Sequence, residues 1–239
     1  DTLQAIRLPN GSHTSIHDTW SPMTTRGGLG RVGSGPMPSH LHWAMGHAML
    51  GTGREDTGLQ AHLHFSGGYG HTHADTLNLM LFAQGRELVS DIGYTHTILR
   101  PYSVSSVGHN LVVVDETEQR SAGDNPPADG RLLVSARLGE IVQFVEACGH
   151  GAYPKATSLY RRALSVVATP EGEAYTLDVF RVRGGSRHDW LLHGSADEDM
   201  TLEADFPLEA FSRGSLLPEG VAFHRWKSAY EYRLINGVN

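Results

Sequence analysis

His71, His73 and Asp75 lie within five positions in GGYGHTHADTLNLMLFAQGRELVSDIGY, the stretch that spans residues 67–94. His71 and His73 stand two positions apart, Asp91 follows near the end of the stretch, and His109 opens the later segment HNLVVVD. Imidazole and carboxylate groups are common ligands of zinc, which needs three or four ligands to converge. Histidine is also the side chain that most readily transfers protons near neutral pH. The residue types therefore permit a metal site, a proton-transfer site, or both.

Histidine is abundant in this chain, with 15 among 239 residues, so a single His-X-His pair carries little weight by itself. Spacing alone gives equal weight to a metal site and to histidines that bind backbone groups at strand ends. If His73, Asp91 and His109 lie on neighbouring strands, they supply two nitrogens and one oxygen to a divalent ion. His71 is then left free for proton transfer.

The residues just before these histidines have the period of a β-strand. In LQAHLHF, residues 59–65, apolar side chains alternate with Gln60, His62 and His64, which predicts a strand with one apolar face. Turns rich in Gly, Pro, Asp and Asn separate the further candidates. Strands are also expected at residues 76–83, 86–93, 109–115, 130–138, 141–147, 159–168, 174–182 and 187–194. Many short strands with few helices predict an all-β fold, an antiparallel multi-stranded β-sandwich.

Composition narrows the classes of function. The hydrophobic content of 39% is sufficient for a buried core, and the net charge of −7 argues against the broad basic surface that a nucleic-acid partner needs. No stretch approaches the roughly 20 apolar residues of a membrane span, so no membrane partner is expected. Residues 1–55 are expected to form a loop-rich segment with one short helix near residues 39–50, and residues 56–239 the β-sandwich domain that carries the candidate metal ligands.

Several blocks of the sequence resemble, in order, the central β-sandwich domain of the heparinase II/III-like polysaccharide lyases, a group that includes alginate and oligoalginate lyases. The blocks are the His-X-His-X-Asp of residues 71–75, the Asp-X-Gly of residues 91–93, and the His-Asn of residues 109–110 that opens a valine-rich strand. The resemblance covers roughly residues 56–195. The opening LPNGSHTSIHDTW also looks like the junction between that family's helical domain and its sandwich, with His17 where glycine is expected.

The resemblance implies a set of roles for these residues. His73, Asp91 and His109 match the ligands of a divalent metal, most often zinc, and His71 matches a catalytic histidine. Tyr102 matches a tyrosine that lines the cleft. The reaction implied is β-elimination on a uronic-acid-containing polysaccharide, in which a base removes the proton next to the uronate carboxylate and an acid protonates the departing glycosidic oxygen.

The resemblance also implies partners. Family enzymes carry an N-terminal α/α toroid that supplies a catalytic tyrosine and a residue that binds the carboxylate. We therefore expect this chain to be the sandwich part of a longer protein, incomplete as a catalyst without the toroid. His13, Trp20 and Tyr69 are expected to contact the substrate, and secretion or a bacterial periplasmic location is implied. Homo-oligomer formation is compatible with the sequence.

Two other functions remain open at this point. A cupin-like metal-dependent oxygenase also uses a His-X-His pair with a later acid and histidine, but it needs His71 as a ligand. A metal-stabilised sandwich that only binds glycan needs no catalytic histidine at all. Tyr69, Tyr94 and Tyr102 lie near the histidines in the sequence, which favours a cleft over a flat binding face.

Overall fold

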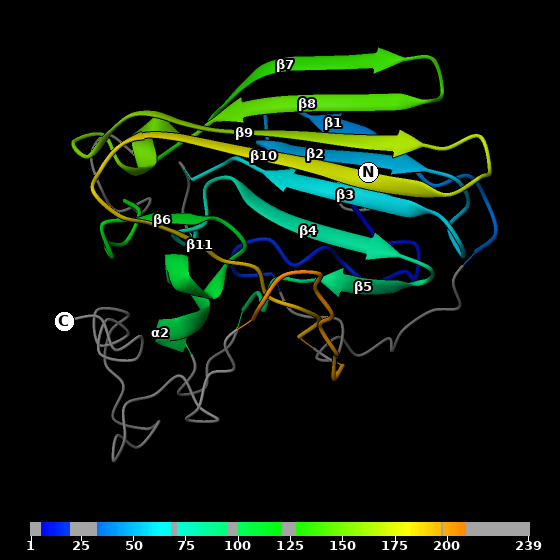
Figure 1. Ribbon diagram of the computed structural model, residues 1–239, viewed down its shortest axis with the longest axis horizontal. Coiled ribbons are helices and arrows are strands. Elements are labelled where there is room, and N and C mark those ends of the chain that lie inside the picture. Colours follow the sequence, from blue (N-terminus) through cyan, green and yellow to red (C-terminus); the bar gives the residue numbers. More distant parts are fainter. Residues whose placement is uncertain are drawn as a thin grey trace.

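The protein is described by a computed structural model that contains two antiparallel sheets and a small two-stranded sheet beside them (Figure 1). The residues that the structure describes are 6–19, 33–67, 71–94, 100–120, 128–196 and 198–208.

The first sheet has the strand order β1-β2-β3-β4-β5, and the second has the order β10-β9-β8-β7. The strands of the first sheet are β1 (His40–His42), β2 (His47–Thr52), β3 (Leu59–His64), β4 (Asn78–Ala83) and β5 (Arg86–Val89). Those of the second are β7 (Arg131–Leu138), β8 (Val142–Cys148), β9 (Thr157–Ala168) and β10 (Ala174–Gly184). The small sheet pairs β6 (Val112–Val114) with β11 (His188–Trp190).

Helical structure in the described residues is limited to short segments. They are α2 (Arg100–Ser103), η2 (Ser106–Gly108) and η3 (His150–Ala152). No helix within these ranges is long and apolar enough to cross a membrane. The structure confirms the predicted antiparallel β-sandwich, and each stretch expected to be a strand contains one.

The main core lies between the two large sheets. Ala61 and Leu63 of β3 are fully buried there and belong to one apolar cluster with Val145 of β8 and Leu164 of β9. Their alternation along each strand places apolar side chains on the inner face, which is the arrangement that stabilises a sandwich. Tyr160 of β9 is also fully buried, and its hydroxyl donates a hydrogen bond to the carbonyl of Val112.

The outer face of β3 is buried as well, contrary to the expectation of a strand with only one buried face. Gln60, His62 and His64 have no exposed surface. The N-terminal segment covers this face: Ile6 and Ile16 pack with methionines of β2 and β4. In Figure 1 the blue N-terminal segment runs behind β4 and β5. The polar side chains of β3 are therefore enclosed between a sheet and a covering segment.

The prediction of a short helix near residues 39–50 is wrong, because this region forms the β1–β2 hairpin. His42 and His47 pair across a turn in which Gly46 adopts a positive φ of 71°. A β-carbon at Gly46 would lie 2.7 Å from the backbone nitrogen of Ser66, so the turn also requires glycine for space. Pairing of β2 with β3 along its whole length outweighs the helix propensity of Ala, Met and Leu here.

Candidate metal centre and active site

Three of the histidine and aspartate residues singled out in the sequence converge in the structure. His73, Asp91 and His109 each offer one ligand atom, these atoms lie within 4.8 Å of one another, and all three side chains are buried. His109 Nε2 lies 3.3 Å from Asp91 Oδ2 and 3.3 Å from His73 Nδ1. The geometry is that of a group that could hold a metal ion with two nitrogens and one oxygen.

The two histidines are oriented by hydrogen bonds on their far sides. His109 Nδ1 lies 2.6 Å from the carbonyl oxygen of Ser105, and His73 Nε2 lies 3.1 Å from Asp18 Oδ1. Because these oxygens only accept, each ring carries its proton at that nitrogen and directs a lone pair from the other nitrogen toward Asp91. Metal-binding histidines are commonly oriented in this way. Burial lowers the pKa of His73 to about 4, so the ring is neutral near pH 7.

Asp91 is held rigidly beside the two rings. Its Oδ2 accepts a hydrogen bond of 2.7 Å from Asn78 Nδ2, and its Oδ1 accepts one of 2.7 Å from the backbone of Gly93. Burial nevertheless raises the pKa of Asp91 to about 6, despite the opposing effect of His109. A cation among these three residues supplies the charge that a buried carboxylate needs, so the donor set fits a divalent metal.

The loops that carry the ligands are fixed from the second sheet. Arg162 on β9 is fully buried and binds Asp178 through two hydrogen bonds of 2.8 and 2.7 Å. Its Nη1 also donates to the carbonyls of Leu77 and Asn110, which lie on the two loops beside the ligands. The side chain of Asn110 continues this connection by donating to the carbonyls of Leu79 and Ser90.

His71 lies outside the ligand group and faces solvent. Its side chain is 87% exposed, and its Nδ1 lies 2.9 Å from Asp18 Oδ2. The His71–His73 pair is not part of an extended strand, because His71 has a φ of 61° in the loop before β4. The two rings instead meet at the carboxylate of Asp18, one at each oxygen.

Asp18 is the member of this site that the sequence did not reveal. Burial acts against its charge, but hydrogen bonds from Arg100, His71 and His73 outweigh that effect and hold the pKa of Asp18 well below its ordinary value. Arg100, at the start of α2, binds Asp18 through Nη1 and stacks on Tyr94 with its guanidinium carbon 4.7 Å from the ring centre. No motif marks Asp18 or Arg100, since they come from segments about 80 residues apart.

Tyr102 lies on α2, next to this group. Its hydroxyl is 3.5 Å from His193 Nδ1, and His193 Nε2 is 3.0 Å from the carbonyl of Val107. His193 follows β11 in a strand-like stretch and carried no catalytic signal in the sequence. Tyr102 thus has a titratable neighbour and remains a predicted cleft residue.

The residues expected to contact the substrate are placed only in part. His13 is half-buried in the N-terminal segment, where its backbone pairs with that of Arg7, and a role in substrate binding stays a prediction. Trp20 and Tyr69 lie outside the described residues.

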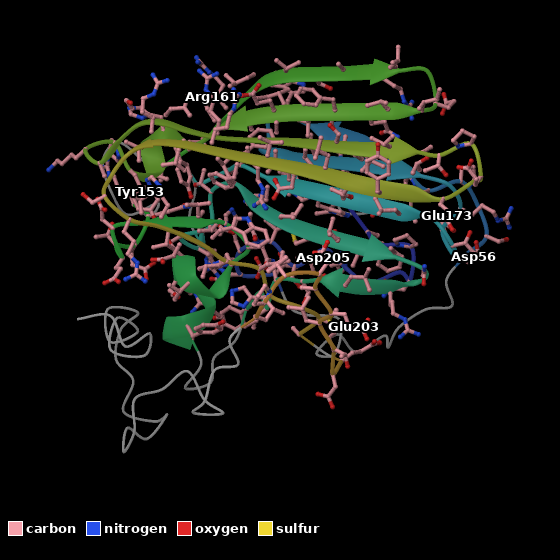
Figure 2. All side chains as sticks on the ribbon, viewed as in Figure 1. Asp56, Tyr153, Arg161, Glu173, Glu203 and Asp205 are labelled. Carbon is pink, nitrogen blue, oxygen red and sulfur yellow. The ribbon has the colours of Figure 1, made fainter. Side chains whose placement is uncertain are left out.

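A sizeable cavity lies away from the histidines. Its volume is about 520 Å³, and its lining includes Thr57, Ala168 and Glu173 from the turns at one end of the two sheets. Figure 2 shows Asp56 and Glu173 at that end of the molecule, with Tyr153 at the other. The lining offers Glu173 as its one ionisable residue, so the cavity lacks the paired groups that acid and base chemistry needs.

The geometry weighs against the oxygenase alternative. That function requires His71 as a ligand, whereas His71 is bound to Asp18 and belongs to neither group of potential ligands found in the described part of the chain. A histidine that is exposed, oriented by a carboxylate and next to a metal-type group is better suited to moving a proton.

Comparison with known proteins identifies the family of the chain and several similar folds. A family model described as heparinase II/III-like, C-terminal, matches residues 61–214. Similar solved structures include a heparan sulfate lyase HepC mutant from Pedobacter heparinus, with TM-score 0.57, 17% identity and coverage of 75% of this chain and 31% of that chain. Another is heparinase III, with TM-score 0.52, 18% identity, and coverage of 69% and 31%. A search of curated protein sequences gives no significant match. At these identities the likeness shows the fold, and the chain spans 31% of the length of each of these two structures.

Proposed function

Because the chain belongs to the heparinase II/III-like family through the C-terminal domain of that family, we propose that it is the metal-binding β-sandwich part of a polysaccharide lyase. The substrate class is uronic-acid-containing polysaccharide, and the reaction is β-elimination. The observation that carries the proposal is the pairing of an exposed, carboxylate-bound His71 with a buried His/Asp/His group.

His71 acts on the proton next to the uronate carboxylate. Asp18 accepts the hydrogen bond from Nδ1–H of His71, which leaves the Nε2 lone pair directed away from Asp18 and able to take that proton. The ionised Asp18 also stabilises the imidazolium that results, as a carboxylate beside a catalytic histidine does. The electrons of the broken C–H bond form the new double bond, and the glycosidic oxygen leaves with a proton from an acid.

The second requirement is stabilisation of negative charge on the uronate. Abstraction of a proton beside a carboxylate develops enolate-like charge, which fixed positive charges and hydrogen-bond donors stabilise best where water is limited. Arg100 supplies a permanent positive charge at the same carboxylate as His71. Tyr102 with His193 supplies a hydroxyl that can donate to substrate or leaving group.

His73, Asp91 and His109 hold the metal, and zinc suits their two nitrogens and one oxygen. The three ligands come from the loops before β4, after β5 and before β6, so a bound ion would hold these loops together. Its role is thus to keep Asp18 and His71 in position. Burial of all three ligands supports this structural role.

The remainder of the active site comes from another domain of the same protein. The helical toroid that accompanies this sandwich in the family supplies the groups that bind the uronate carboxylate, and the residues before β1 form the junction. The boundary expected at residues 55 and 56 is wrong, because β1 and β2 belong to the first sheet of the sandwich. A secreted or periplasmic location follows from such a substrate. His13, Trp20 and Tyr69 contact the glycan from the sandwich side.

Incubation of the full-length protein with a panel of uronate polymers tests the proposal. Elimination leaves a conjugated unsaturated uronate, so ultraviolet absorbance rises together with new reducing ends, and His71→Ala abolishes both. New reducing ends without a rise in absorbance would identify a hydrolase and contradict the proposed reaction.

A further inference from the structure

A second group of potential ligands lies beside the first and shares no residue with it. His17, His64 and Asp75 each offer one ligand atom, the three atoms lie within 4.8 Å of one another, and all three residues are buried. His73 is a neighbour of this group, because its backbone N–H donates to His17 Nδ1 at 3.2 Å.

Three different segments deliver these side chains to one place. His64 is the last residue of β3, on the face that the N-terminal segment covers. His17 belongs to that covering segment, and its Nε2 lies 2.9 Å from His64 Nε2. Asp75 lies in the loop before β4, with Oδ1 3.3 Å from His17 Nδ1. Only Asp75 belongs to a motif of the sequence, the His-X-His-X-Asp of residues 71–75, so it is the fold that brings the three residues together.

The carboxylate of Asp75 is the feature that favours a bound cation in this group. Its side chain has no exposed surface, and neither carboxylate oxygen accepts a hydrogen bond from the residues that the structure describes. A buried carboxylate is costly unless hydrogen bonds or an opposite charge compensate for it. The carboxylate of Asp91 nearby has two such hydrogen bonds, whereas Asp75 has only the contact with His17.

We propose that His17, His64 and Asp75 bind a second divalent transition-metal ion, with zinc as the best suited. Two imidazoles and one carboxylate form a donor set that zinc uses widely. His47 supports the site from behind, with its Nδ1 3.4 Å from His64 Nδ1. Both histidine ligands lie away from solvent, and the ion would lock the N-terminal segment onto the first sheet.

The competing explanation is an ion pair without metal. In that case a protonated His17 compensates the charge of Asp75: burial favours neutral His17, but Asp75 outweighs burial and raises the pKa of His17. This explanation accounts for His64, whose Nε2 accepts from Nε2–H of His17 at 2.9 Å. It does not account for the backbone N–H of His73, which donates to His17 Nδ1, because an imidazolium has no lone pair there. The number of ions that the protein binds separates the two explanations.

Titration of the metal-free protein with Co²⁺ tests the proposal, with absorbance of the bound ion and elemental analysis as readouts. The expected result is saturation at two ions per chain. Saturation at one ion that is lost in His73→Gln would overturn the second site. One ion that is lost in His64→Gln and kept in His73→Gln would uphold the second site and overturn the first.

A matched pair of variants assigns the second ion. His62 and His64 lie on the same face of β3 and are both fully buried, but His62 contacts Gln60 and His47 and belongs to neither ligand group. His64→Gln is expected to bind one ion and His62→Gln two. Equal stoichiometry in the two variants would overturn the assignment. If circular dichroism shows that His64→Gln does not fold, Asp75→Asn takes its place. This variant is also expected to bind one ion.

Discussion

At the scale of single residues, the carboxylate of Asp18 contacts two histidines for which different roles are proposed. Asp18 contacts His73 at one carboxylate oxygen and His71 at the other. In the proposed function the same group therefore orients a metal ligand and a proton acceptor. His71 and His73 were predictable from the motif and from the family resemblance. Asp18 was not, because its role depends on the N-terminal segment lying against the loop before β4, and on Arg100 arriving from α2.

The first prediction concerns Asp18→Asn in the full-length protein. The amide cannot stabilise an imidazolium or fix the Nδ1–H form of His71, so kcat is expected to fall by about 10²-fold or more. Steady-state kinetics on a uronate polymer measure this, with metal content checked in the same preparation. Asp56→Asn is the matched control, since Asp56 is exposed and lies at the end of the molecule away from α2 (Figures 1 and 2). Unchanged kcat in Asp18→Asn would contradict the role given to Asp18.

At the scale of elements, the loops that carry the ligands depend on a strand of the other sheet. Arg162 and Arg161 are neighbours on β9, but they face opposite sides: Arg162 is buried against Asp178 and two loop carbonyls, whereas Arg161 lies 3.8 Å from Glu146 near the surface. Period two predicts that adjacent residues of a strand point to opposite faces. It does not predict which of the two arginines faces the loops, because the carbonyls that Arg162 binds belong to residues some 50 to 85 positions away in the sequence.

The second prediction compares these two arginines. Arg162→Met leaves Asp178 without its partner and two carbonyls without a donor, so the free energy of unfolding is expected to fall by about 3–5 kcal/mol. Arg161→Met removes an exposed ion pair and is expected to cost about 1 kcal/mol or less. Urea unfolding measures both values. Similar losses in the two variants would show that Arg162 does not brace the loops.

The third prediction concerns pH and the buried face of β3. Burial lowers the pKa of His62 to about 3, against an ordinary value of 6.5. Between these values the unfolded chain binds a proton at His62 that the folded chain does not, so stability falls as pH decreases. From pH 6.5 to pH 5 the loss is about 2 kcal/mol for this one group. Urea unfolding across this range measures it.

His62→Gln removes this contribution, so its free energy of unfolding should depend less steeply on pH than that of the wild type. His150→Gln, at an exposed histidine in η3, serves as the control and should keep the wild-type slope. If His62→Gln kept the wild-type slope as well, His62 would not be a neutral group in the folded protein.

At the scale of the whole molecule, the fold was largely predictable and the site only in part. Alternation of apolar and polar residues located the strands from residue 59 onward, since that pattern follows from one buried face per strand. The same pattern left β1 and β2 unpredicted, because HAMLGT has no alternation of apolar and polar residues and the hairpin depends on pairing with β3. The group of His17, His64 and Asp75 was beyond prediction for a similar reason: it exists only where a covering segment closes over a sheet.

The fourth prediction compares this chain with the full-length protein. The sandwich is expected to bind its metal alone, because all the ligands are in the chain, but to lack detectable lyase activity. The full-length protein is expected to show both properties, since the helical domain completes the cleft. Elemental analysis and the absorbance assay on both proteins test this. Full activity of the sandwich alone would contradict the division of the active site between two domains.

Metal content of the purified protein, measured by elemental analysis for wild type, His73→Ala and His71→Ala, tests the central claim most directly. That claim is that one histidine of the pair is a ligand and the other is free to move a proton. The account predicts that His73→Ala loses one zinc per chain relative to wild type, while His71→Ala keeps the wild-type content. Equal loss in both variants, or no loss in His73→Ala, would contradict it.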